Sequence, residues 1–214
     1  MDILIKFLLC YLLGSIIGSL MIGKFIGVDI RTRGSGNAGA TNAFRTQSFW
    51  FGLFVLVIDF GKGFMASGIV ANWTLSADSS TINMPHNLLV LLCGLAAILG
   101  HVYPLFFNFR GGKGAGTAAG VVVAIFPQFL FIALLTWISV TVISGYVGLG
   151  TIVAGISLPL YTWFSGFGSD NPYFFVFSIF IAVFMIYTHR RNIIRMRQGS
   201  ENRIKRPRFP LRKQ

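Results

Sequence analysis

Two glycine-rich segments of the sequence combine a flexible backbone with cationic side chains. The first, RGSGNAGATNAFRT (33–46), is rich in small residues and contains Arg45 near its end. Glycines permit positive φ angles, and successive N–H groups can then form a concave nest for an anion. Neutral hydrogen-bonding side chains are added by Ser35, Asn37, Thr41 and Asn42. The segment therefore predicts an oxyanion site, with an ordinary flexible loop as the alternative.

The second segment, GHVYPLFFNFRGGKGAGTAAG (100–120), resembles a phosphate-binding loop only in part. A nucleotide P-loop requires G-x-x-x-x-G-K-[ST], but Phe107 and Gly114 occupy the places of the first glycine and the hydroxyl. The glycines still free the backbone, Lys113 supplies a point charge, and a helix expected from about Thr117 directs its amide ends at the loop. An anion other than a nucleotide fits this pattern.

A third polar segment, YTHRRNIIRMRQGSEN (187–202), follows the last apolar run. His189 and Asn192 are three residues apart and so share a helix face, and histidine suits proton transfer near neutral pH. A solvated helix end is the alternative for this pair. His101, at the end of an apolar run, is expected to be structural.

The composition is that of an integral membrane protein. Of 214 residues, 54% are hydrophobic and 11% charged, and the mean hydropathy is +0.72. Apolar runs occupy about 3–25, 48–71, 87–102, 116–165 and 173–189, and several are long enough to cross ~30 Å of hydrocarbon. The fold class is therefore all-α, a polytopic transmembrane helical bundle.

The placement of the basic residues explains the net charge of +12 without a nucleic-acid partner. Of 18 basic residues, 16 lie in three segments outside the apolar runs: 24–45, 110–113 and 190–213. Connections 72–86 and 165–172 contain no Lys or Arg. This is the positive-inside pattern. It places the three segments in the cytoplasm, and the basic tail is expected to contact anionic membrane lipids.

The run 116–165 is too long for one crossing. Because the basic segments 110–113 and 190–213 both lie in the cytoplasm, an even number of crossings separates them. The last run supplies one of these, so the run 116–165 must supply an odd number. Three crossings, with breaks near Pro127 and in SGYVGLG (144–150), give about seven helices, with the N-terminus outside and the C-terminus cytoplasmic. The helix near 117–126 would be unusually short, and a five-helix alternative makes this region re-entrant. Residues 1–190 form a single transmembrane domain, and residues 191–214 form a basic cytoplasmic tail.

Besides Lys24 at the end of the first run, three charged residues lie inside the apolar runs. Asp59 and Lys62 share a helix face at i, i+3 and are expected to pair in the bundle interior, because such groups are costly in lipid. Lys6 is expected to snorkel to the membrane interface.

Several chemistries are disfavoured by the sequence. The histidines do not cluster with Cys or carboxylates at metal-ligand spacing, so neither a metal site nor a cofactor is expected. No histidine is followed five residues later by Asp, as in thioester-using glycerolipid acyltransferases. Cys10 and Cys93 lie in apolar runs, which argues against a thiolate nucleophile.

Taken together, GSGNAGATN with Arg45, DFGKG, GHVYPLFFNFRGGKG, SGYVGLG and HRRN followed by Glu201 resemble one family. It is the bacterial membrane glycerol-3-phosphate acyltransferase family that uses acyl phosphate. Two positions depart from the family pattern: Ala38 stands where proline is usual, and Gly148 stands where serine is common, which leaves Ser144 and Thr151 as the nearby hydroxyls.

The resemblance implies acyl transfer from acyl phosphate to the 1-hydroxyl of sn-glycerol 3-phosphate, giving lysophosphatidic acid and phosphate in the committed step of phospholipid synthesis. It implies a multi-pass protein of the bacterial plasma (inner) membrane with a cytoplasmic active site. The implied catalytic residues are Ser35, Arg45, Lys113, His189 and Asn192. The implied acyl-phosphate-binding residues are Ser35, Gly36, Asn37, Gly39, Thr41, Asn42, Gly111, Gly112 and Gly114. The implied glycerol-3-phosphate-binding residues are Arg45, Lys113, Thr151, His189 and Asn192.

Two alternatives remain open at this point. The proton of the attacking hydroxyl is accepted either by His189 or by the acyl phosphate itself, and we favour the substrate. Glu201 is expected to fix the start of the tail. A transporter of a phosphorylated solute is the rival function, although the chain shows no second copy of GSGNAGATN or GGKG.

Overall fold

The computed structural model describes residues 2–73 and 84–204, and within these ranges the chain is helical with no β-strand. The helices are α1 (Asp2–Gly14), α2 (Gly18–Phe25), η1 (Ile30–Thr32), α3 (Ala40–Thr46), α4 (Phe49–Met65), η2 (Ala66–Val70), α5 (His86–Val102), η4 (Leu105–Phe107), α6 (Ala115–Ile125), α7 (Pro127–Ser144), α8 (Val147–Phe164), α9 (Phe167–Asp170), α10 (Pro172–Thr188) and α11 (Arg190–Arg197). The predicted all-α class is confirmed.

Over its described ranges, the structure gives four to six candidate membrane spans and one shorter apolar helix, so the count of about seven transmembrane helices stays a prediction. In the described part of the chain, four helices are long and apolar enough to cross a membrane, and two bent helix pairs raise this to six. The shorter apolar helix is α6, whose 11 residues span about 16 Å, roughly half of the hydrocarbon core. The run 116–165 divides before Pro127 and again at Gly145, as predicted, because proline begins α7 and Gly145 adopts a positive φ of 78° after it.

The first apolar run is not one continuous helix. It divides into α1 and α2, which are bent by 50°. The break has partners elsewhere in the fold: Lys62 Nζ donates to Ile16 O at 2.7 Å, and Leu105 N donates to Ser15 Oγ at 3.2 Å. A group from α4 therefore satisfies the Ile16 carbonyl that the break frees, and the start of η4 is held against the Ser15 side chain.

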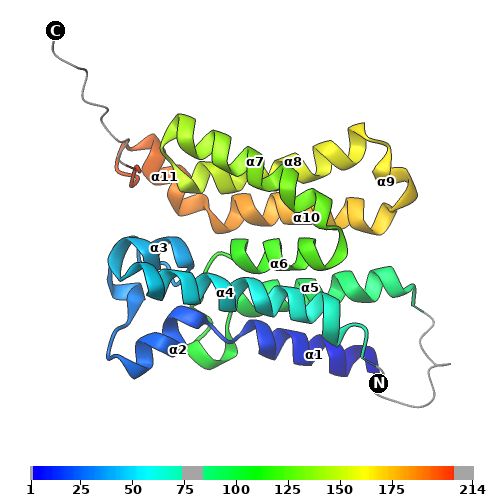
Figure 1. Cartoon of the computed structure of the whole chain (residues 1–214), viewed down its shortest axis with the longest axis horizontal. Helices are drawn as coiled ribbons and strands as arrows, with labels where there is room; N and C mark the ends of the chain where they lie inside the picture. The colour runs from blue at the N-terminus through cyan, green and yellow to red at the C-terminus, as the bar shows by residue number, and fades with distance from the viewer. Residues whose placement is uncertain (1, 74–83, 205–214) are drawn as a thin grey trace, which may run out of the picture.

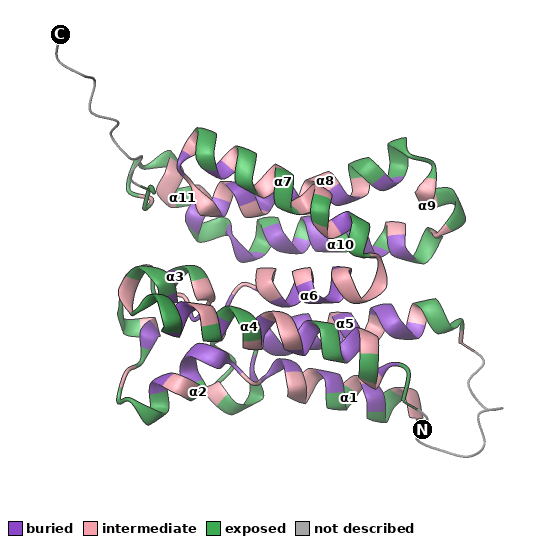
Figure 2. Ribbon diagram, in the orientation of Figure 1, coloured by how far each residue is buried: buried purple, intermediate pink, exposed green. Residues whose placement is uncertain are grey.

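The helices form two groups with α6 between them (Figure 1). One group contains α1, α2, α4 and α5, and the other contains α7, α8 and α10. Buried residues lie mainly on the inward faces of these helices, whereas large apolar side chains such as Phe54 and Val142 are exposed (Figure 2). An outward apolar surface suits a bundle surrounded by lipid.

The cation-rich elements gather at one end of the bundle. Helices α2, α3 and α11 lie at the end opposite the start of α1 (Figure 1). These helices carry Lys24, Arg45 and the arginines of 190–197. The structure thus brings the basic segments together, as the positive-inside pattern predicts, and which membrane face they occupy stays a prediction.

The charged residues of the apolar runs are buried. Asp59 and Lys62 form the expected pair, with Oδ1 and Nζ 3.1 Å apart. The snorkelling prediction for Lys6 is wrong: its side chain is buried, and Nζ donates to Ala71 O at 2.8 Å. Its ammonium is satisfied by a carbonyl just beyond η2, because the start of α1 lies beside this helix end.

Candidate active site

The segment between η1 and α3 is shaped by the side chain of Asn42. Its Oδ1 accepts a hydrogen bond from Ser35 N at 2.9 Å. Its Nδ2 donates to the carbonyls of Ile30, Arg33 and Asn37 at 3.2, 3.0 and 3.0 Å. Asn42 is 1% exposed, so these bonds are shielded from water. The amide is thus committed to folding residues 30–37, which we call the serine loop.

Positive φ angles explain two glycines of the serine loop. Gly34 and Gly36 have φ of 56° and 72°, a region that glycine adopts at little cost. A side chain at position 34 would also overlap Asn42. The loop consequently turns tightly enough for Ser35 and Asn37 to face the same cavity.

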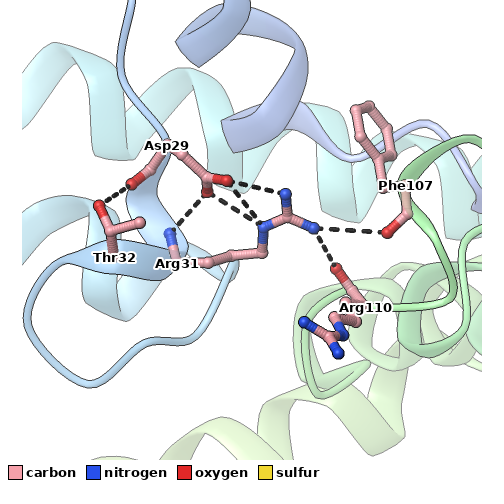
Figure 3. Close-up of polar contacts among 5 residues, drawn as sticks. All are labelled: Asp29, Arg31, Thr32, Phe107 and Arg110. Carbon is pink, nitrogen blue, oxygen red and sulfur yellow. Dashed lines mark hydrogen bonds and ion pairs between the residues drawn. The ribbon is translucent and has the colours of Figure 1, made fainter.

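Arg31 joins the serine loop to the next polar segment (Figure 3). It forms an ion pair with Asp29 at 2.8 Å, and Nη1 reaches the carbonyls of Phe107 and Arg110 at 3.4 and 3.2 Å. Because both acceptors precede the second glycine cluster, Arg31 fixes one glycine-rich segment relative to the other.

The second glycine cluster, residues 111–114, forms what we call the Lys113 loop. Gly111 and Gly112 donate their N–H groups to Val102 O and His101 O at 3.2 and 3.1 Å. Gly114 precedes α6 with φ 84°, and Ala118 N donates to Gly114 O. The N–H groups of Ala115, Gly116 and Thr117 therefore have no acceptor within the helix. The amides of this region that remain available to an anion are those at the start of α6.

A polar network connects the Lys113 loop to α11 and the residues after it. Lys113 Nζ donates to Asn192 Oδ1. Asn192 Nδ2 donates to Glu201 Oε1 at 2.9 Å, and Arg195 Nε donates to Glu201 Oε2 at 2.6 Å. Glu201 thus fixes the orientation of the Asn192 amide, in addition to its predicted contact with the start of the tail.

His189 lies immediately after α10 and is buried. Its Nδ1 is 2.9 Å from Met185 O, and since a carbonyl only accepts, Nδ1 carries the proton. Nε2 of the neutral ring is then an acceptor. Burial, assisted by the Lys113 charge, lowers the pKa of His189 to about 3. The imidazole is accordingly neutral at physiological pH and can accept a hydrogen bond from a hydroxyl.

Burial also lowers the pKa of the Lys113 ammonium, to about 8. The positive charges of Arg195 and Arg45 act in the same direction, and Glu201 opposes them. Lys113 remains mostly protonated at neutral pH. Concentrated positive charge that destabilises a cation is favourable for a bound anion.

One cavity, with a volume of about 380 Å³, collects most of the predicted residues. Those on its wall are Ser35, Asn37, Gly39, Thr41, Asn42, Arg45, Lys113, Gly114, Thr151, His189 and Asn192. They come from η1–α3, the Lys113 loop, α8 and the α10–α11 junction. Arg45 and Lys113 therefore lie on the same side of the molecule, as the sequence predicts.

The cavity also has an extended apolar wall. Helices α6, α7, α8 and α10 supply Val122, Leu130, Ala133, Leu134, Ala154, Leu158 and Ile181. A groove with a cationic end and an aliphatic wall matches a ligand with an anionic head and a long hydrocarbon chain.

Three predicted glycines are not on the cavity wall: Gly36, Gly111 and Gly112. The N–H of Gly36 donates to Arg33 O at 3.0 Å, and those of Gly111 and Gly112 bind the end of α5. These amides are occupied because the loops close on neighbouring carbonyls. Glycine content alone does not reveal which N–H groups are already bonded.

The hydroxyls near SGYVGLG have different environments. Thr151 lines the cavity, donates to Val147 O at 3.0 Å and accepts from Trp137 Nε1 at 3.2 Å. Ser144 donates to Val140 O and accepts from Tyr146 N, so it ends α7. A β-carbon at Gly148 would lie 2.8 Å from Asn192 Nδ2, and glycine there leaves room for Asn192.

The cavity wall includes Asp59, His101 and Glu201, which we did not predict as site residues. Asp59 and His101 lie on α4 and α5, and the imidazole Nδ1 is 3.4 Å from Asp59 Oδ1. The intramembrane charge of Asp59 was the available signal, because buried carboxylates need partners. For His101 the only signal in the sequence was its place shortly before the glycine cluster.

Comparison with known proteins identifies strong similarity over nearly the whole chain. Residues 4–199 match the family described as "Glycerol-3-phosphate acyltransferase". A protein of that name from Salinibacter ruber is 41% identical over 206 residues, covering 92% of this chain and 90% of the relative. The Aquifex aeolicus protein of the same name is 39% identical and covers 95% and 100% of the two chains.

Solved structures agree with the sequence matches. The crystal structure of PlsY (YgiH), an integral membrane glycerol 3-phosphate acyltransferase, in its glycerol 3-phosphate form, gives a TM-score of 0.81 at 39% identity and covers 96% of each chain. Its lysphosphatidic acid form gives 0.80 at 37% identity.

Proposed function

Because this chain belongs to the glycerol-3-phosphate acyltransferase family, we propose that it transfers an acyl group from acyl phosphate to the 1-hydroxyl of sn-glycerol 3-phosphate. The products are lysophosphatidic acid and inorganic phosphate. The observation that carries the proposal is a single cavity that joins Arg45 and Lys113 to an aliphatic wall. Both substrates bear a phosphate group and one bears a hydrocarbon chain. The cationic end of the cavity suits the two phosphate groups, and its aliphatic wall suits the chain.

The acyl-phosphate head is assigned to the serine loop and the start of α6. Ser35, Asn37 and Thr41 offer side-chain donors on the wall, and Ala115 and Gly116 at the start of α6 line the same space. Asn42 holds this loop in shape, because its own amide is occupied. The acyl chain then lies along α6, α7 and α8.

Glycerol 3-phosphate is assigned to the cationic part of the wall. Arg45 and Lys113 neutralise its phosphate, and Asn192 orients Lys113 through a direct hydrogen bond. His189 Nε2 accepts a hydrogen bond from the 1-hydroxyl, and Thr151 supplies a further hydroxyl on the wall.

The reaction requires one bond to form and one to break. The 1-hydroxyl oxygen attacks the acyl carbon, and the bond between that carbon and the bridging phosphate oxygen breaks. The hydroxyl proton goes to the departing phosphate, which leaves as hydrogen phosphate. Positioning and positive charge lower the barrier, since phosphate is already a good leaving group.

The low pKa of His189 bears on the choice of base. A base with a pKa of about 3 holds a proton weakly at neutral pH, whereas efficient general bases have pKa values near the working pH. The acyl phosphate oxygens are therefore the better acceptor, and His189 serves to orient the hydroxyl.

Purified protein in liposomes provides the test. Given acyl phosphate and glycerol 3-phosphate, it should release phosphate and lysophosphatidate at equal rates. Acyl-CoA in place of acyl phosphate should give no turnover, and equal rates with both donors would refute the assignment of the donor. Uptake of glycerol 3-phosphate without acyl transfer would instead support the transporter hypothesis.

We place the protein in the bacterial inner membrane with the cavity open to the cytoplasm, on the basis of the clustered basic residues. Cys10 and Cys93 are buried, so a single introduced cysteine can be labelled selectively. A membrane-impermeant maleimide should not label Lys24→Cys in intact cells and should label it in inverted vesicles. Labelling in intact cells but not in inverted vesicles would show the opposite topology.

A further inference from the structure

We propose that Asp59 and His101 are positioning residues that hold the Lys113 loop in its place against the bundle interior. The geometry on which this depends is independent of the reaction, but its effect on glycerol 3-phosphate binding rests on the function proposed for Lys113. Four contacts carry the inference.

The first contact is between the His101 ring and the backbone of Gly112. A methyl group at position 112 would overlap Nε2 and would lie 2.9 and 3.0 Å from Cε1 and Cδ2 of the imidazole. Gly112 is buried, and its N–H donates to His101 O at 3.1 Å. The loop therefore rests directly on the ring, one residue before Lys113.

The second contact holds the opposite edge of the ring. His101 Nδ1 is 3.4 Å from Asp59 Oδ1, and both side chains are 3% exposed. Nδ1 has no hydrogen bond of regular geometry to any residue in the described ranges. The carboxylate is thus the group that orients the imidazole.

The third and fourth contacts anchor Asp59. Lys62 Nζ is 3.1 Å from Asp59 Oδ1, and the same Nζ donates to Ile16 O at 2.7 Å. The chain of contacts runs from the break between α1 and α2 to the loop that presents Lys113. A shift of the imidazole should move the loop, because the ring is packed directly against the backbone of Gly112.

The test combines kinetics with chemical labelling of the full-length protein in detergent. His101→Ala should raise KM for glycerol 3-phosphate about tenfold, with KM for acyl phosphate and kcat nearly unchanged, since misplacement of Lys113 weakens one substrate. An amine-reactive reagent, followed by peptide mass spectrometry, should label Lys113 faster in this variant. His86→Ala, at the exposed start of the same helix, is the matched control and should change neither quantity.

Gly112→Ala changes the loop side of the contact with the His101 ring and leaves the buried charges in place. Alone it should raise the same KM, but in the His101→Ala background the methyl group occupies vacated space and should add less than about twofold. Additive effects would overturn the proposal. So would an unchanged labelling rate in a His101→Ala protein that unfolds at the wild-type temperature. If wild-type protein shows no acyl transfer, the proposed function fails, but the labelling rates still decide this inference.

Discussion

Lys113 donates a hydrogen bond from Nζ to Oδ1 of Asn192, and this contact joins residues 79 positions apart in the chain. The partner is a neutral amide, so it orients the ammonium without cancelling its charge. A carboxylate in the same place would compete with a phosphate. Glu201 contacts the other side of this amide, where its Oε1 accepts a hydrogen bond from Asn192 Nδ2. The site therefore presents an oriented and uncompensated cation to its ligand.

Replacing Lys113 by Ala removes this cation. A charged hydrogen bond contributes about 1.5–3 kcal/mol, which corresponds to an increase in KM for glycerol 3-phosphate of roughly 10- to 100-fold. Arg45→Ala should act in the same direction. Steady-state kinetics at saturating acyl phosphate measures the effect, and the exposed Lys24→Ala serves as control. Wild-type KM values in both site variants would show that the phosphate binds elsewhere.

The titration of Lys113 predicts the alkaline limb of the pH profile. Its pKa is about 8, so the ammonium is charged below this pH and neutral above it. For the free enzyme, kcat/KM for glycerol 3-phosphate should fall as the pH rises through 8. Lys113→Arg keeps its charge in this range, since the guanidinium pKa exceeds ~12, and should lack this fall. A limb that persists in the Arg variant would assign the titration to another group.

Much of the fold follows from local signals in the sequence. Pro127 and Gly145 mark helix boundaries, because proline fixes φ at the start of a helix and glycine permits the positive φ that ends one. The bend between α1 and α2 has no such residue at its centre, Ile16. Its free carbonyl accepts a hydrogen bond from Lys62, which lies 46 positions away. A break that is stabilised by a distant side chain has no local signature.

The same distinction applies to the site. The places of Arg45 and Lys113 on the cavity wall could be predicted because cations beside glycines suggest anion binding, and that of His189 because it shares a helix face with Asn192. The occupied amides of Gly111 and Gly112 could not, since their acceptors become neighbours only when the chain turns back after α5. The contact between Asp59 and His101 likewise depends on how α4 packs against α5.

Asn42 offers a test of loop positioning. Asn42→Asp keeps an acceptor for Ser35 N but loses the donor to three carbonyls, so stability should fall by about 1–3 kcal/mol and KM for acyl phosphate should rise. Asn42→Ala should also destabilise the loop, without the repulsion between a new carboxylate oxygen and these carbonyls. Thermal unfolding and donor kinetics report the two effects. Asn72→Ala, near η2 and away from the serine loop, should leave donor kinetics unchanged.

Glu201 can be altered in two steps. Glu201→Gln keeps an acceptor for Asn192 and loses the charge that pairs with Arg195, whereas Glu201→Leu loses both. KM for glycerol 3-phosphate should rise in that order. Because Glu201 raises the pKa of Lys113, the alkaline limb should move to lower pH in both variants. An alkaline limb at the wild-type pH in both variants would show that Glu201 does not affect the pKa of Lys113.

His189 distinguishes the two candidates for the base. If the hydroxyl proton goes to the acyl phosphate, His189→Ala loses only an orienting hydrogen bond, and kcat should fall about tenfold. His189→Gln, whose amide oxygen can also accept, should recover part of this loss. A general base typically contributes about 10²- to 10⁴-fold. A decrease of about 10³-fold or more in both variants would therefore identify His189 as the base, and single-turnover measurements at saturating substrates separate this chemical step from product release.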